Sequence, residues 1–177
     1  FQAHQMSENV GSLAGMSVPS PAVYVIDNGG GTRLLFDPFA YAVEQSVRSL
    51  GSDSEFSLLL AAEPLEDQDY ATEMPGGYVP AGEPGVQAVS DFLNAPWMGQ
   101  ANLSAALRKA VGMHPACVVL LTNKGVDDAD ALIGEARAAG VKMIVLGVTE
   151  DPEEVTVLKR LADETGGEAL TMSRRNL

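Results

Sequence analysis

The 177-residue chain has little of the chemistry on which most enzymes depend: it holds one cysteine, two histidines and one tryptophan. The lone Cys117 excludes a disulfide within the chain, and its apolar surroundings, ACVVLL, are typical of a small buried side chain. His4 and His114 do not stand in a metal-ligand spacing. No G-x-S-x-G nucleophile motif is present either. We therefore expect a protein that is not an enzyme.

Basic residues are also scarce, with 11 Lys and Arg against 24 Asp and Glu and a formal net charge of −13. Nucleic acids and anionic membrane surfaces both attract a cationic face, which this composition does not supply. No apolar run reaches the ~18 residues of a membrane-spanning helix. We expect no nucleic acid partner and no direct membrane insertion by this segment. Because the chain begins with Phe1 rather than Met, we also expect it to belong to a larger parent chain, whose compartment the sequence does not indicate.

The distribution of apolar residues divides the chain into three parts. Residues 1–21 are rich in Ser, Gly, Gln and Pro and have no sustained periodicity, so we expect an N-terminal arm or linker. Residues 22–171 alternate between apolar runs and amphipathic segments, and residues 172–177 follow as a short tail. The length of the middle part, together with a hydrophobic content of 46%, suits one domain with a substantial core.

The middle part reads as strands that alternate with helices. Four near-continuous apolar runs have the length of strands buried on both faces: AVYVIDN, EFSLLLAAE, ACVVLLTN and VKMIVLGV. Between Phe36 and Leu50 the apolar residues follow one helix face, and four further helices are indicated downstream. This order predicts an α/β fold with a doubly wound, mostly parallel central sheet and helices on both faces.

Local signals mark several of the element ends. Asp127 can cap one of the downstream helices, and Gly140 stands where a left-handed C-terminal cap belongs. Asp151, followed by Pro152 and an acid at Glu154, forms a typical helix start. Residues 63–85 make a long connection rich in acids, Pro and Gly, in which GGYVP can form a short edge strand.

Five segments in order resemble the successive blocks of a von Willebrand factor type A domain: VYVIDNGGGT, GQANLSAALRKAV, CVVLLTNKG, VKMIVLGV and LKRLADETGGEAL. The resemblance covers residues 22–171. It implies a Rossmann-like central sheet with one short antiparallel edge strand. It also implies a metal-ion-dependent adhesion site, built from D-x-S-x-S on the first loop, a Thr on the second and an Asp on the third.

Only one of those five ligand positions keeps its residue in this chain. Asp27 matches the first position, whereas Gly29 and Gly31 replace the two serines, Ala101 falls on the threonine and Asn123 falls on the last aspartate. A hard divalent cation wants about six oxygen ligands, and glycine and alanine offer no side-chain oxygen. The resemblance therefore implies a degenerate metal site, and we expect no metal and no cofactor.

Two alternatives stay open at this point. Ser104 or Thr32 can supply a substitute ligand, which would preserve a metal-dependent adhesion domain. The glycines of DNGGGT can also begin a nucleotide-binding loop, which would indicate an α/β enzyme. Against this, Leu34 stands where G-x-G-x-x-G needs its third glycine, and the lysine of a P-loop is missing.

We therefore interpret the chain as a non-catalytic module that binds a protein partner in a metal-independent way. Ligands of doubly wound sheets bind beyond the carboxyl ends of the strands, where the loop after the first run and the segment NAPWMGQ are expected to meet. The candidate contacts are one apolar pair and three residues of the first loop, namely Trp97, Met98, Asn28, Gly30 and Thr32. The alternative for Trp97 is that it packs on the preceding helix, at Phe92 or Leu93.

Overall fold

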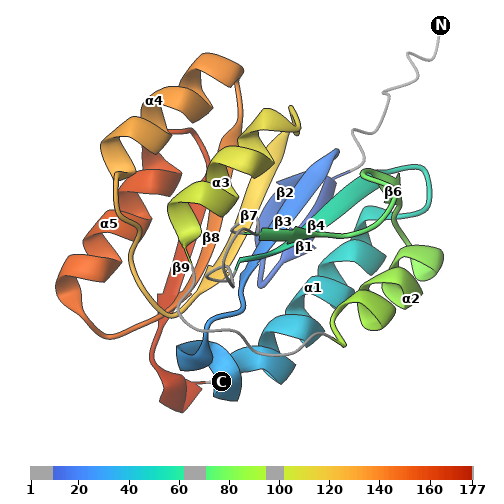
Figure 1. Ribbon diagram of the computed structural model, residues 1–177, viewed down its shortest axis with the longest axis horizontal. Coiled ribbons are helices and arrows are strands. Elements are labelled where there is room, and N and C mark those ends of the chain that lie inside the picture. Colours follow the sequence, from blue (N-terminus) through green and yellow to red (C-terminus); the bar gives the residue numbers. More distant parts are fainter. Residues whose placement is uncertain (1–9, 62–70, 95–101, 177) are drawn as a thin grey trace, which may run out of the picture.

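The computed structural model describes residues 10–61, 71–94 and 102–176 of the chain (Figure 1). Its central sheet has the strand order β5-β4-β3-β7-β8-β9. The five longer strands run parallel: β3 (Ala22–Asp27), β4 (Glu55–Ala61), β7 (Cys117–Thr122), β8 (Lys142–Val148) and β9 (Glu168–Met172). β5 (Ala71–Glu73) and β6 (Val79–Pro80) both pair antiparallel with β4. The predicted α/β fold is confirmed.

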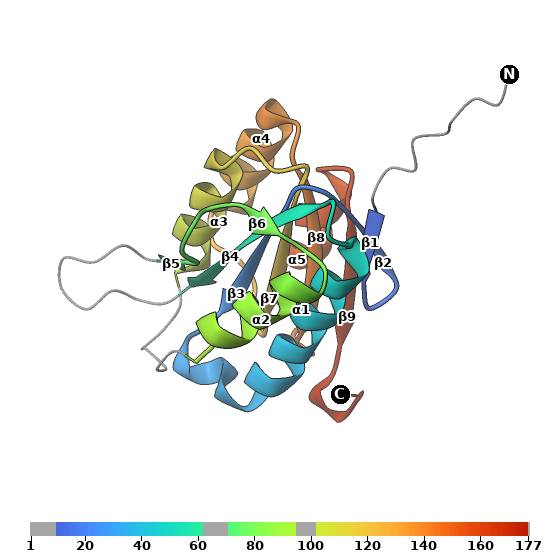
Figure 2. The same ribbon diagram turned by 90° about the vertical axis from the view of Figure 1, so that its right-hand side faces the viewer.

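Helices cover both faces of this sheet. α1 (Phe36–Leu50) and α2 (Glu83–Phe92) lie on one face, and α3 (Leu103–Gly112), α4 (Ala129–Ala139) and α5 (Pro152–Asp163) lie on the other (Figure 2). Two 3₁₀ turns complete the described elements, η1 (Gly30–Leu35) between β3 and α1 and η2 (Arg174–Asn176) after β9. The first of these turns holds Gly30 and Gly31 of the first loop, and Gly29 precedes it.

The central strands β3, β4, β7 and β8 are largely apolar because each one separates two cores. In β3, Tyr24 and Ile26 belong to the core beneath α1 and α2, whereas Val23 and Val25 belong to the core beneath the other three helices. All four side chains are fully buried. Successive side chains of a strand point to opposite faces, so a sheet covered on both sides needs a continuous apolar run. The runs seen in the sequence are therefore those of the parallel strands.

Most of the predicted helix ends are confirmed, and one is wrong. Gly140 ends α4 with a φ of 70°, and the carboxylate of Asp151 accepts a hydrogen bond of 2.9 Å from the N–H of Glu153 at the start of α5. Asp127 does not cap α4. Asp128 stands at that position, with a left-handed φ of 56° and no side-chain cap bond, so the helix begins one residue later than the sequence indicates.

Part of the segment expected to be an arm forms a β-hairpin instead. β1 (Val10–Leu13) pairs antiparallel with β2 (Met16–Pro19), and both residues of the connecting turn have positive φ, as a type I′ hairpin turn requires. Leu13, Met16 and Val18 are buried in the core beside α1. Each strand has only four residues, which is too short for a clear alternation in sequence, and this explains why the hairpin escapes prediction.

Hydrogen bonds as well as apolar contacts hold the hairpin against α1. The hydroxyl of Ser49 accepts a bond of 2.8 Å from the N–H of Ser12 and donates its proton to the Ser46 carbonyl at 2.6 Å, with the Ser12 carbonyl farther away at 3.3 Å. One helix side chain thus fastens the backbone of Ser12 on β1 to α1. Within the described residues, no helix is long and apolar enough to cross a membrane.

Candidate functional site

The two central strands, β3 and β7, end side by side in polar residues. The Asp27 carboxylate, at the end of β3, accepts hydrogen bonds from the Gly29 N–H at 2.9 Å and from the Thr122 hydroxyl, at the end of β7, at 3.0 Å. Asp27 is only 2% exposed. Burial raises the pKa of the Asp27 carboxyl above its ordinary value, although the Gly29 N–H and the charge of Lys124 lower it in part. Asp27 thus accepts one hydrogen bond from its own loop and one from the end of β7.

The first loop is held by its own hydrogen bonds. The Thr32 hydroxyl donates to the carbonyls of Asp27, at 2.7 Å, and Gly29, at 2.8 Å. The Asn28 N–H donates to the Ala61 carbonyl of β4 at 2.7 Å. Gly29 has an extended backbone with a φ of −72°. No left-handed conformation therefore requires a glycine there.

The loop after β7 is joined to the first loop. The side-chain amide of Asn123 donates a hydrogen bond of 3.0 Å to the carbonyl of Gly31. The guanidinium of Arg174, in η2, donates a second bond of 3.3 Å to the same carbonyl. Sequence reasoning missed Arg174, because no local signal links the end of the chain to a loop 143 positions earlier.

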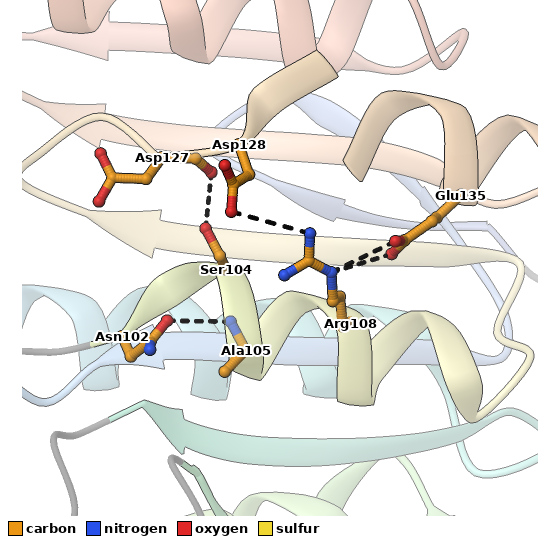
Figure 3. Close-up of polar contacts among 7 residues, drawn as sticks. All are labelled: Asn102, Ser104, Ala105, Arg108, Asp127, Asp128 and Glu135. Carbon is orange, nitrogen blue, oxygen red and sulfur yellow. Dashed lines mark hydrogen bonds and ion pairs between the residues drawn. The ribbon is translucent and has the colours of Figure 1, made fainter. Parts of the chain in front are cut away.

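The start of α3 reaches the same edge of the sheet. Asn102 caps the helix, its side-chain oxygen accepting a bond of 3.1 Å from the Ala105 N–H. The Ser104 hydroxyl donates a bond of 2.6 Å to the Asp127 carbonyl (Figure 3). Two candidate substitute ligands, Ser104 and Thr32, thus both donate their hydroxyl protons to backbone carbonyls. The predicted residues Trp97, Met98 and Ala101 lie outside the described residues.

A polar groove opens beside these contacts, between the first turn of α3, the residues after β7 and the first turn of α5. Its volume is about 760 Å³. Arg108 forms one wall, where its guanidinium lies 3.3 Å from Glu135 and 3.9 Å from Asp128 (Figure 3). Carboxylates outnumber bases among the ionisable residues that line the groove, which are Arg108, Lys124, Asp127, Asp128, Glu153 and Glu154.

The described residues of this edge do not fit a hard divalent cation. Within the described ranges, no group of three or more His, Cys, Asp or Glu side chains is placed to hold a metal. Both carboxylate oxygens of Asp27 already accept hydrogen bonds. Asn123 directs its amide nitrogen, a donor, toward the first loop. Such ions need about six oxygen ligands, and the described side chains of this edge do not supply that set.

Comparison with known proteins finds similarity in structure but not in sequence. No protein-family model matches the chain, and no curated protein is detectably similar to it in sequence. Among solved structures, the SpRpn10 VWA domain superposes with a TM-score of 0.61 at 12% identity, covering 86% of each chain. The chain has a von Willebrand factor type A fold. The sequence resemblance is thereby confirmed at the level of the fold.

Two further structures share this von Willebrand A-like arrangement. The N-terminal domain of TFIIH p34 has a TM-score of 0.60 at 10% identity, over 84% of this chain and 88% of that one. The human COPII-coat protein Sec24c has a TM-score of 0.64 at 9% identity. The match covers 86% of this chain and 29% of Sec24c, so the von Willebrand A-like fold accounts for less than a third of that protein.

Proposed function

We propose that this von Willebrand A-like chain is a non-catalytic protein-binding domain, whose partner docks at the carboxyl edge of the central sheet without a bridging metal ion. The observation that carries the proposal is the groove of about 760 Å³ at that edge. Doubly wound sheets bind their ligands beyond the carboxyl ends of the strands. A groove with both carboxylate and guanidinium walls suits the charged surface of a protein better than an apolar small molecule.

The hydrogen bonds of this edge support the metal-independent part of the proposal. Asn123 bonds to Gly31, and Thr122 bonds to Asp27, so the loops after β7 and β3 are joined by direct contacts. Ser104 in turn joins α3 to the loop that precedes α4. These contacts link three segments that a cation bound among them would otherwise bridge.

Trp97 and Met98 remain the proposed apolar anchors of the partner. Interface anchors are enriched in aromatic residues, and their truncation costs ~2 kcal/mol or more of binding. Trp97→Ala separates this role from packing, because loss of a buried Trp side chain costs ~3–5 kcal/mol of folding stability instead. Unchanged binding by a folded Trp97→Ala chain would move the anchor elsewhere.

Site-specific photo-cross-linking tests the docking edge. Benzoylphenylalanine at Asp127, an exposed position beside the groove, should capture a protein partner from cell extract. The matched control carries the same probe at Asp53, an exposed position between α1 and the start of β4, and should capture nothing in common with it. Addition of a chelator should leave the capture unchanged. Capture at Asp53 alone, or loss of capture with the chelator, would contradict the proposal.

A further inference from the structure

The carbonyl of Gly31 holds an arginine at the rim of the candidate site. Arg174 donates its 3.3 Å bond to this carbonyl from η2, and the bond uses one of the five N–H donors of a guanidinium. Arg175, the next residue, has no hydrogen bond from its side chain to any described residue; its backbone N–H donates to the Ser173 hydroxyl. Two adjacent guanidinium groups thus stand at the edge with most of their donors available.

A small hollow lies against these two arginines. Its volume is about 280 Å³, and it is lined by Asn123, Val148, Thr149, Glu150, Arg174 and Arg175. Pockets for small molecules run from ~300 to ~1,000 Å³, so this hollow has the size for one side chain rather than for a cofactor. Its position, beyond the ends of β7 and β8, places it on the same edge as the larger groove.

The two arginines also lack carboxylate partners within the described ranges. Arg48, Arg108 and Arg160 each lie within 4 Å of a carboxylate. No such ion pair involves Arg174 or Arg175 among the described residues, although the chain has 24 acidic residues against 11 basic ones. In so acidic a chain, an adjacent pair of arginines without acidic partners at a candidate binding edge is available to a carboxylate from outside.

We propose that Arg174 and Arg175 form a carboxylate-binding site, which takes the side chain of one Asp or Glu from an exposed loop of the protein partner. The inference rests on the proposed function, because it names the chemistry by which the partner is held. A planar guanidinium can donate two parallel hydrogen bonds to a carboxylate, and these charge-assisted bonds are stronger than neutral ones. The bond to Gly31 fixes the position of Arg174 and leaves its other donors for the incoming group.

The negative charge of Glu150 restricts the charge of the ligand that the hollow can bind. Glu150 lines the same hollow but forms no ion pair within 4 Å with either arginine in the described structure. Its negative charge disfavours a second anion nearby. The hollow therefore suits a singly charged carboxylate better than a phosphate group, which carries nearly two charges at neutral pH.

Titration of the chain with blocked tripeptides tests the site directly. The side-chain Nε–H signals of Arg174 and Arg175 should shift in a saturable way with a central aspartate or glutamate, and should not shift with asparagine. Arg174→Gln with Arg175→Gln should weaken this binding at least about tenfold, as expected for loss of charged hydrogen bonds. Glu150→Gln should strengthen it about threefold, because an exposed like charge is removed.

Three controls keep the result specific. Arg137→Gln with Lys159→Gln removes two exposed cations from α4 and α5 and changes the net charge equally, so it should leave binding within about twofold of the original. Arg174→Lys keeps the charge but loses the planar guanidinium. It should bind the tripeptide more weakly than the original chain but more tightly than the double glutamine variant. Equal loss in both double variants, or binding of a phosphoserine tripeptide about tenfold tighter than the aspartate one, would overturn the assignment.

The cross-linked partner separates this inference from the proposed function. If the partner captured at Asp127 binds the Arg174→Gln, Arg175→Gln chain as tightly as the original, the carboxylate site is wrong while the docking edge stands. If no partner is captured at Asp127, the docking edge is wrong, and the tripeptide titration still decides whether the arginines bind a carboxylate. A loss of partner affinity of about tenfold, with an unchanged melting temperature, supports both.

Discussion

The side-chain amide of Asn123 donates a hydrogen bond of 3.0 Å to the backbone carbonyl of Gly31, so the loop after β7 is fastened directly to the loop after β3. The resemblance to von Willebrand A domains puts a metal-ligand position at each of these two residues. Here the two positions contact each other instead. The contact supports the proposal that a partner docks at this edge without a bridging metal ion.

Divalent cations should therefore not stabilise the chain. A ligand at a hundred times its dissociation constant adds ~2.7 kcal/mol to the free energy of unfolding, which would raise the melting temperature by several degrees. We expect no change in melting temperature with Mg²⁺ or Mn²⁺, and none on addition of a chelator. A rise with Mg²⁺ that the chelator abolishes would show that substitute ligands hold an ion. The positive control is the chain with Gly29→Ser, Gly31→Ser, Ala101→Thr and Asn123→Asp, which should gain metal affinity.

The Asp27 carboxylate should matter to the fold as an acceptor more than as a charge. Asp27→Ala leaves the buried Gly29 N–H without its partner, and we expect it to lower the free energy of unfolding by about 1–3 kcal/mol. Asp27→Asn keeps an acceptor oxygen and removes a charge that burial disfavours, so it should cost less. Urea unfolding of both variants checks the order. Equal losses would indicate that the charge itself is what the site requires.

Two helix glycines should respond to alanine in opposite directions. A Cβ on Gly85, in α2, would lie 2.7 Å from the Phe56 ring and 2.8 Å from the Pro80 carbonyl, so Gly85→Ala should destabilise the fold by about 1–3 kcal/mol. A Cβ on Gly134, in α4, would meet nothing within 4 Å. Gly134→Ala should therefore stabilise by about 0.5–1 kcal/mol, through the greater helix propensity of alanine. Thermal unfolding of the two variants provides the comparison.

The Cys117 thiol should stay unreactive in the folded chain. Burial raises its pKa to about 12, so almost no thiolate exists at pH 8, and Ellman's reagent should react only after unfolding. Between the ordinary thiol pKa of 9.0 and 12, the unfolded chain loses this proton while the folded chain keeps it. Stability should accordingly fall as the pH rises through that window, by at most about 1.4 kcal/mol per pH unit from this group. Cys117→Val should remove that part of the slope.

The long elements were predictable because their sequence patterns are set by the two cores. The apolar run that becomes β3 has to be continuous, since Val23 and Tyr24 face opposite sides of a covered sheet. The helix from Phe36 to Leu50 was predicted with the ends that the structure gives it. Among the short elements, the edge strand expected in GGYVP is confirmed as β6 (Val79–Pro80), whereas β1, β2 and β5, of three or four residues, escape this reasoning. β5 lies inside the acidic connection, and only its pairing with β4 makes it a strand.

The candidate site was predictable only in part. The end of an apolar strand marked Asp27, and the topology of a parallel sheet placed it near Asn123. The contact of Arg174 with Gly31 was not predictable, because a contact between residues 143 positions apart depends on the completed fold. The position of Asp128 at the start of α4 was missed for a smaller reason. Two successive aspartates precede the helix, and only the backbone decides that the second has the left-handed φ.

The hydrogen bond between Asp27 and Thr122 joins residues that are 95 positions apart. It lies at the junction of β3 with β7, where the N-terminal strands of the sheet meet the C-terminal ones. Loop-closure entropy makes such distant pairings late and slow steps of folding.

During synthesis, the N-terminal strands emerge from the ribosome before β7 exists, and one side of β3 has no neighbour. Unpaired apolar strand edges favour aggregation, so the period before Cys117 is translated is when the nascent chain most needs protection. A chain truncated before Cys117 should accordingly bind chaperones or precipitate under conditions in which the whole chain remains in solution.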